Sequence, residues 1–294
     1  MTTSLPTAPV GGFGRRLARW FHRNPRARLA ALLAAPTLWL VLAYLGSLVA
    51  LLATSLYSLN DLTSAIVHKV GLSNFRAIFT GHVYRAVTVR TVGIAVAVTV
   101  IDVVVALPIA FYLAKVAGPR VRSFAAVAVL LPLWASYLVK AYAWRAIVTP
   151  SGGVLDRWFG GTPGFGSVAV TLTLAYLWLP YMVLPIFSGL ERLPDSLLEA
   201  SADLGGRAGR TFVGVIVPLL KPAIVAGSIF TFSLSLGHYI AVRIVGGTQQ
   251  MLGGVVYANF VDNLPLAAAY SCVPVALMVV YLSLARRTGA FENL

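Results

Sequence analysis

Six long apolar runs divide this chain, and each is long enough to cross the hydrocarbon core of a bilayer, which takes about 20 residues. The runs lie near 29–55, 91–114, 123–144, 167–190, 223–244 and 265–285. Only 11% of the residues are charged, whereas a soluble domain carries about 25%. Backbone groups in lipid have no water to bond, so every span is expected to be helical. The sequence therefore predicts an all-α membrane protein with six transmembrane helices.

The basic residues fall mostly on one side of the predicted membrane. If the N-terminus is cytoplasmic, the inner segments carry Arg15, Arg16, Arg19, Arg23, Arg26, Arg28, Lys115, Arg120, Arg122, Arg192, Arg207, Arg210, Lys221, Arg286 and Arg287. The outer segments carry fewer, namely Lys69, Arg76, Arg85, Arg90, Arg145, Arg157 and Arg243. Cytoplasmic loops are enriched in Lys and Arg, so we expect both termini inside. Residues 1–28 would be a basic cytoplasmic segment, and 286–294 a cytoplasmic tail.

The net charge of +14 is thus explained by topology and by contact with the lipid membrane. No basic motif interleaved with aromatic residues occurs in the sequence. Nucleic acid is therefore not an expected partner.

The loop between the fourth and fifth spans, residues 191–222, contains the clearest local signals. Ser196 is followed three residues later by Glu199, the spacing of a capping box, which predicts a helix beginning at Ser196. Gly205 tolerates the left-handed backbone that commonly ends a helix. A helix this short is marginal in water, so we expect a groove on a partner to hold it. The alternative is an ordinary amphipathic loop helix.

This loop resembles the EAA loop of ABC-importer permeases, whose pattern is Glu-Ala-Ala, three residues, Gly, nine residues and Ile-x-Leu-Pro. Glu199, Ala200 and Gly205 match it, Ser201 occupies its third position, and residues 215–218 end it. In that family the loop is a coupling helix that docks into a cytoplasmic ATPase. The resemblance implies that the coupling residues here are Ser196, Glu199, Ala200, Asp203, Leu204, Gly205 and Pro218.

The resemblance extends over most of 71–285 and is nearest to spermidine/putrescine-type permeases. The segments that carry it are 71–75, 131–145, 203–205, 246–253 and 264–269. It implies the type I importer (MetI-like) permease fold over 29–285, in the plasma membrane of a bacterium. The implied function is inward movement of a small polar solute by alternating access, with spermidine or putrescine as the indicated example. The implied partners are an ATPase dimer, a second permease subunit and an extracytoplasmic solute-binding protein.

Sequence motifs of catalysis are missing. No Gly-x-x-x-x-Gly-Lys-Ser/Thr phosphate loop occurs, and neither His-Glu-x-x-His, Gly-x-Ser-x-Gly nor a cysteine pair is found. ATP and Mg²⁺ are therefore expected in a partner ATPase chain. We expect this chain to be no enzyme and to hold no cofactor or metal of its own.

Polar and aromatic residues of the spans are the candidates for the solute pathway. Asp102 lies about a dozen residues into the second span, near the bilayer midplane, and an ionisable group there is a functional candidate. Alternatively it pairs with a tyrosine, a backbone group or the partner permease. His238 stands where this subfamily often has an acid. The other candidates are Trp134, Tyr137, Trp178, Ser235 and Tyr239. The aromatic rings among them can hold ammonium groups or form interface belts. Lys140 is expected to be structural.

Three other readings remain open from the sequence. The chain could be an importer permease for a different solute, such as a phosphonate, a metal or another small organic molecule. It could be a stand-alone secondary carrier that uses Asp102 as a proton or sodium site. It could also be a membrane scaffold that transports nothing. Co-purification with an ATPase distinguishes the first from the other two.

Overall fold

The computed structural model describes residues 20, 24–60 and 65–287 and divides into two compact units, Met1–Ala53 and Thr54–Leu294. Most of the predicted basic segment 1–28 and of the tail 286–294 lies outside the described residues. In the first unit, α2 (Pro25–Trp39) and the π-helical stretch η1 (Leu40–Leu45) lead into α3 (Gly46–Ser55), which ends just past the unit's boundary. The apolar helix Arg28–Ser55 corresponds to the first predicted span.

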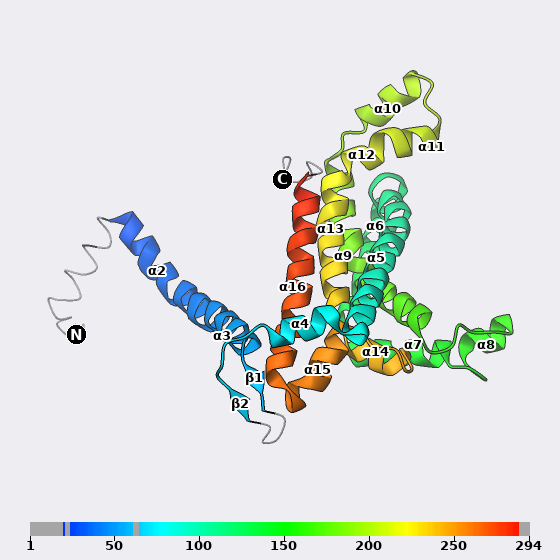
Figure 1. Cartoon of the computed structure of the whole chain (residues 1–294). Helices are drawn as coiled ribbons and strands as arrows, with labels where there is room; N and C mark the ends of the chain where they lie inside the picture. Colours follow the sequence, from blue (N-terminus) through cyan, green and yellow to red (C-terminus); the bar gives the residue numbers. More distant parts are fainter. Residues whose placement is uncertain (1–19, 21–23, 61–64, 288–294) are drawn as a thin grey trace, which may run out of the picture. The chain divides into compact units, whose positions relative to one another are not determined.

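The second unit begins with a hairpin whose two strands have two residues each. A helical bundle follows it (Figure 1). Strand β1 (Ser58–Leu59) pairs antiparallel with β2 (Ile66–Val67), with Ser58 opposite Val67. The helices that follow are α4 (Ser73–Thr80), α5 (His82–Phe111), η2 (Tyr112–Val116), α6 (Pro119–Trp134), α7 (Tyr137–Val148), α8 (Val154–Phe159), α9 (Ser167–Arg192), α10 (Ser196–Asp203), α11 (Ala208–Thr211), η3 (Phe212–Ile216), α12 (Val217–Leu219), α13 (Lys221–Leu236), α14 (Ile240–Val245), α15 (Leu252–Asp262) and α16 (Leu264–Arg287).

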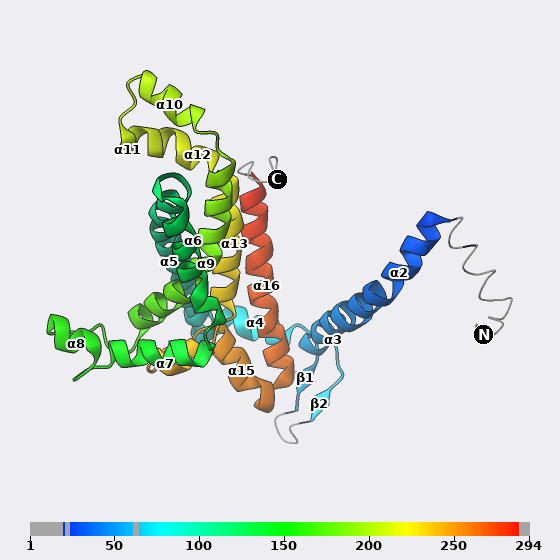
Figure 2. The same ribbon diagram turned by 180° about the vertical axis from the view of Figure 1, so that it is seen from behind.

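Helices α5, α9 and α13 form the centre of this bundle and pack against one another (Figures 1 and 2). Apolar residues of α5 and α9, such as Ala106 and Met182, are completely buried there. Gly227 of α13 faces Met182, and a Cβ added at Gly227 would lie 2.6 Å from the Met182 sulfur. The glycine therefore allows α13 to approach α9 closely, as small residues do between membrane helices.

The structure has four straight helices that could span a membrane, and six spans if each of two bent helix pairs counts as one. Both counts of spans are for the described residues. The predicted spans 123–144 and 223–244 are helical, but each is interrupted by a break. The third span bends by 97° between α6 and α7, at Ala135 and Ser136. A bend of 69° precedes α13, and residues 237–239 separate α13 from α14.

Proline chemistry and compensating contacts account for these breaks. A proline ring clashes with the carbonyl four residues earlier in a continuing helix, and Pro222 is in the first turn of α13. Ala135 and Ser136 have extended backbone, which leaves carbonyls at the end of α6 without helical partners. The Lys140 ammonium donates to one of them, the Pro132 carbonyl, at 2.8 Å. This contact gives Lys140 a structural role across the bend.

We predict that Gly227→Val destabilises the bundle by about 1–3 kcal/mol, because the added carbons would overpack the contact with Met182. Gly93→Val on α5 is the matched control, since a Cβ at Gly93 meets no atom within 4 Å. Thermal unfolding of both detergent-solubilised variants measures the difference. Equal loss of stability in the two variants would contradict the close approach of α13 and α9.

Candidate functional site

Helix α10 begins at Ser196 and ends at Asp203, so the helix predicted from Ser196 and Glu199 is confirmed. Its first N–H groups are satisfied by the backbone: the Asp195 carbonyl accepts from Leu198 at 2.9 Å and Glu199 at 3.1 Å. Within residues 65–287, the Ser196 hydroxyl donates no hydrogen bond. Gly205 has a φ of +75°, the left-handed conformation expected there.

The turn after α10 also depends on Gly206, which follows Gly205 directly. The Gly206 N–H donates to the Ser201 carbonyl at 2.8 Å, and a Cβ at Gly206 would lie 2.6 Å from that oxygen. The Ser201 hydroxyl hydrogen-bonds the Thr211 hydroxyl at 2.8 Å. These contacts close α10 and α11 into a hairpin.

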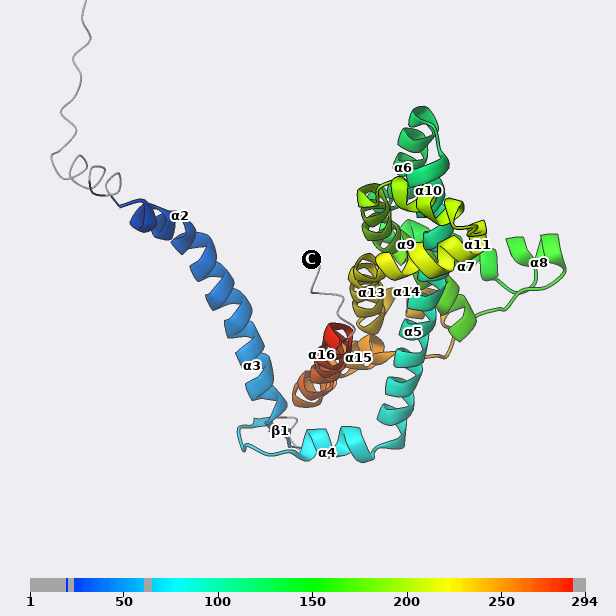
Figure 3. The ribbon, with the colours of Figure 1, turned by 90° about the horizontal axis from the view of Figure 1, so that it is seen from above.

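One side of α10 packs on the bundle, and another is left uncovered by this chain (Figure 3). Leu198 packs against the core cluster that contains Ile216 and Leu220. The predicted coupling residues Ser196, Glu199, Ala200, Asp203 and Leu204 are all exposed. The Leu204 side chain, at the tip of the hairpin, is 89% exposed. Pro218 lies farther along, exposed in α12.

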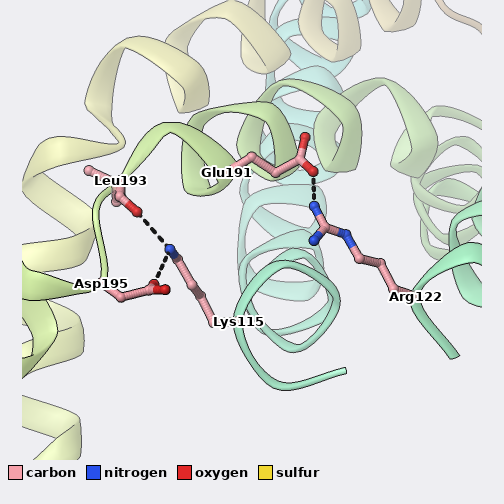
Figure 4. Close-up of polar contacts among 5 residues, drawn as sticks. All are labelled: Lys115, Arg122, Glu191, Leu193 and Asp195. Atoms are coloured by element: carbon pink, nitrogen blue, oxygen red, sulfur yellow. Dashed lines mark hydrogen bonds and ion pairs between the residues drawn. The ribbon is translucent and has the colours of Figure 1, made fainter. Parts of the chain in front are cut away.

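Two basic residues connect the end of α9, and the residues that follow it, to η2 and α6 (Figure 4). The Lys115 ammonium, in η2, donates to the Leu193 carbonyl at 2.7 Å and to an Asp195 carboxylate oxygen at 2.6 Å. Arg122, in α6, pairs with Glu191. We call these two contacts, Lys115 with 193–195 and Arg122 with Glu191, the latch. The sequence analysis assigned Lys115 and Arg122 only to the cytoplasmic side.

We predict that Lys115→Met loosens the start of α10, because it removes both hydrogen bonds that hold residues 193–195. Hydrogen bonds that involve a charged group contribute about 1.5–3 kcal/mol, and the exposed Asp195 carboxylate reduces this toward the lower end. Hydrogen exchange of amides 195–199 should become about tenfold faster. Lys221→Met, at the far end of the same loop, is the control. Unchanged exchange in Lys115→Met would show that the latch does not hold α10.

Three of the predicted pathway residues meet where the two broken spans adjoin. Tyr137, the first residue of α7, hydrogen-bonds through its hydroxyl to Nε2 of His238, in the break between α13 and α14. The Ala241 N–H donates to the same nitrogen at 3.3 Å. Because Nε2 accepts these bonds, the proton of the neutral ring is on Nδ1. The Trp178 ring lies edge-on to His238, with centroids 5.6 Å apart.

The other predicted aromatic and hydroxyl residues lie apart from this cluster. Trp134, at the end of α6, is 91% exposed. The Ser235 hydroxyl is buried and donates to the Thr231 carbonyl of its own helix at 2.7 Å. Tyr239 stacks on Tyr257 with centroids 4.8 Å apart. The aromatic residues predicted for the pathway therefore do not form a single site.

Asp102, on α5, is buried within this chain. It is 1% exposed, and Val98 and Ala106, one turn away on either side, are fully buried. Neither carboxylate oxygen has a hydrogen-bond partner in the described part of the chain, and the Trp178 indole N–H also has none. The expected pairing with a tyrosine or backbone group is not found there. A partner subunit could not reach Asp102 in this conformation.

No cluster of three or more His, Cys, Asp or Glu side chains suited to a metal occurs among the described residues. The structure does contain two cavities beside α15, of about 380 Å³ and 340 Å³, and Tyr239 and Tyr257 line both. The lining of the larger cavity is mixed and includes Arg243 and Gln249. The sequence analysis identified neither cavity, because their walls come from turns and short helices.

Comparison with known proteins was made for the sequence and for the fold. A family model described as "Binding-protein-dependent transport system inner membrane component" matches residues 91–288. The inner membrane ABC transporter permease protein YdcU of Escherichia coli K12 is 39% identical, over 98% of this chain and 97% of its own length. The spermidine/putrescine transport system permease protein PotB of Escherichia coli K12 is 28% identical, over 87% of this chain and 95% of its own.

Solved structures show the same fold at lower sequence identity. A chain of a bacterial ABC transporter that imports the acidic polysaccharide alginate has a TM-score of 0.69 and 14% identity, and the match covers 92% of this chain and 99% of that one. An alginate transporter in complex with an alginate pentasaccharide-bound periplasmic protein gives a TM-score of 0.70 at 14% identity, over 92% of this chain and 96% of that one. The inward-facing MetNI methionine transporter gives 0.56 at 16% identity, over 71% and 97%.

Proposed function

The chain belongs to the family of binding-protein-dependent transport system inner membrane components, and we propose that its transport is driven through α10 by a cytoplasmic ATPase. It is a multi-pass membrane protein and an ABC importer permease subunit, not an enzyme. The predicted all-α, MetI-like permease fold is confirmed. The proposal concerns how the subunit is powered, what it carries and with which partners it works.

The uncovered side of α10 is the observation that carries the coupling proposal. A helix of eight residues is too short to be stable alone, yet it presents Glu199, Ala200 and the fully formed Gly205 turn away from the bundle. The latch connects the residues before α10 to η2, which continues α5, and connects the end of α9 to α6. A rigid-body movement of α10 would therefore reach the central helices. An ATPase dimer that binds ATP and Mg²⁺ would supply that movement, since this chain has no phosphate-binding loop.

The proposed assembly follows from this arrangement. The latch end of the bundle faces the cytoplasm together with both termini, so that 1–28 and 286–294 flank a permease domain over 29–285. A second permease subunit completes the pore, and an extracytoplasmic solute-binding protein delivers the solute to the opposite end. The excess of Lys and Arg on the α10 side supports this orientation.

A small polar cation of the polyamine class is the proposed solute. The relatives named as spermidine/putrescine permeases support it, and so does the ring cluster of Tyr137, Trp178 and His238, because aromatic faces attract ammonium groups. Asp102 lies deeper, between Val98 and Ala106 on α5. We propose that it enters the solute path when α5 shifts relative to α9 and α13 during alternating access.

Coupling is tested by Glu199→Lys and Gly205→Val, which we expect to reduce ATP-dependent uptake at least tenfold while membrane insertion is retained. A β-branched residue is strained at the positive φ of Gly205, and Glu199→Lys reverses a charge on the uncovered face. Gly209→Val is the control, because a Cβ at Gly209 meets no atom within 4 Å. Uptake and ATPase co-purification are measured on the assembled complex in proteoliposomes. Normal uptake with both variants would refute the coupling role of α10.

Solute charge is tested by Asp102→Asn, which keeps the side-chain shape and removes the charge. If Asp102 meets a polyamine ammonium, loss of a charge-assisted contact of about 1.5–3 kcal/mol should lower spermidine uptake tenfold to over a hundredfold. Thr99→Val, one turn earlier on α5, is the uncharged control. Unchanged spermidine uptake by Asp102→Asn at normal protein levels would remove Asp102 from the pathway.

A further inference from the structure

A cavity lined by both polar and apolar groups lies beside α14 and α15, at the end of the bundle opposite α10 (Figure 1). Its volume of about 380 Å³ lies within the range of ligand pockets, about 300–1,000 Å³. Its walls are Tyr239 and Arg243, Tyr257 on α15, and the turn of residues 247–250. No Asp or Glu lines it. The cavity is therefore rich in hydrogen-bond donors and carries one positive charge.

Arg243 is oriented in this cavity without an acidic partner. The centre of its guanidinium group lies 5.2 Å from the ring centroid of Tyr257, and that ring stacks on Tyr239 at 4.8 Å. The ion pairs found in the described part of the chain join other residues, Lys115 with Asp195 and Arg122 with Glu191. An arginine fixed by aromatic stacking presents its planar donors to a carboxylate, which it can bind through two parallel hydrogen bonds.

Gln249 places a second, independent requirement on the group that occupies the cavity. Its side-chain amide oxygen is buried and has no hydrogen-bond partner among the described residues. The Gln249 backbone N–H donates to the Gly246 carbonyl at 3.0 Å, which holds the turn in place. Buried acceptors are normally paired with a donor. The group that occupies the cavity should therefore bring an N–H or O–H for Gln249 as well as a carboxylate for Arg243.

These requirements exclude a polyamine and favour a peptide. An ammonium ion near Arg243 would be repelled by the like charge, so the cavity is no site for a cationic solute. A peptide segment with an acidic side chain offers a carboxylate and backbone N–H groups together. The exposure of Arg243 and Gln250 makes the cavity accessible to a protein loop. A similar fold has been solved in complex with a periplasmic protein.

We propose that this cavity receives an acidic loop of the extracytoplasmic solute-binding protein, with the loop carboxylate on Arg243 and a loop N–H on Gln249. The inference rests on the proposed function, because it assigns an entry point to one of the proposed partners. Docking at this end would bring the partner next to Tyr239, the neighbour of His238, and so close to the break between α13 and α14.

The test measures the affinity of the solute-loaded binding protein for the full importer in nanodiscs. Arg243→Glu should weaken binding at least tenfold, the size of effect expected from loss of a charge-assisted contact. Arg243→Lys should fall between the wild type and Arg243→Glu, because it keeps the charge and loses the planar fork. Gln249→Met should weaken binding several-fold. Arg157→Glu, another exposed arginine outside the cavity, is the matched control and should change affinity less than twofold.

A charge reversal in the partner completes the test. Among acidic residues of the binding protein, one change to lysine should restore affinity for the Arg243→Glu importer. If Arg243→Glu does not fold, Arg243→Gln serves instead. Unchanged affinity in the Arg243 variants overturns the proposal, including the case in which the cavity serves a small anion. Failure of the proposed function gives a different result. The wild-type chain would then recruit no ATPase, and this result would not depend on the residue at position 243.

Discussion

The lack of hydrogen-bond partners in lipid is the constraint on which the rest of this structure depends. Every backbone group of a span must be satisfied within the protein, yet the third and fifth spans are both interrupted. Side chains from the next turn replace the missing bonds: Lys140 reaches the Pro132 carbonyl, and His238 accepts from the Ala241 N–H. The chain can therefore keep two irregular segments in the bundle, and Tyr137 connects them through His238.

This arrangement divides the protein into a rigid centre and two ends with different tasks. The centre is the close packing of α5, α9 and α13, where Gly227 lies against Met182. At one end the latch connects η2 to the residues before α10, and α6 to the end of α9. At the other end the short helices α14 and α15 enclose the cavity of Arg243. Force applied at α10 and a partner bound at the cavity would thus act on the same central helices from opposite sides.

The sequence contained the parts of this architecture that depend on composition and local pattern. Apolar runs located the spans because lipid selects for length and hydropathy, and Ser196, Glu199 and Gly205 located α10 because helix ends have local rules. The complete breaks at Ala135 and before Lys221 were not located, since proline in a membrane helix is compatible with either a bend or a break. The latch joins residues that are far apart in the sequence, so spacing could not indicate it. In the sequence, Trp134 and Tyr137 were equivalent candidates for the solute pathway. Only the bend between α6 and α7 places them in different surroundings.

The central claim is that α10 is the attachment point of an ATPase. A photo-crosslinking amino acid placed at Leu204, whose side chain is 89% exposed at the tip of the hairpin, tests it most directly in membranes that contain the whole importer. The account predicts one dominant crosslinked product, in which mass spectrometry identifies an ATP-binding cassette subunit, and no such product from position 158 on α8. Crosslinking of the ATPase at position 158 and not at 204, or of lipid alone at 204, would contradict the account.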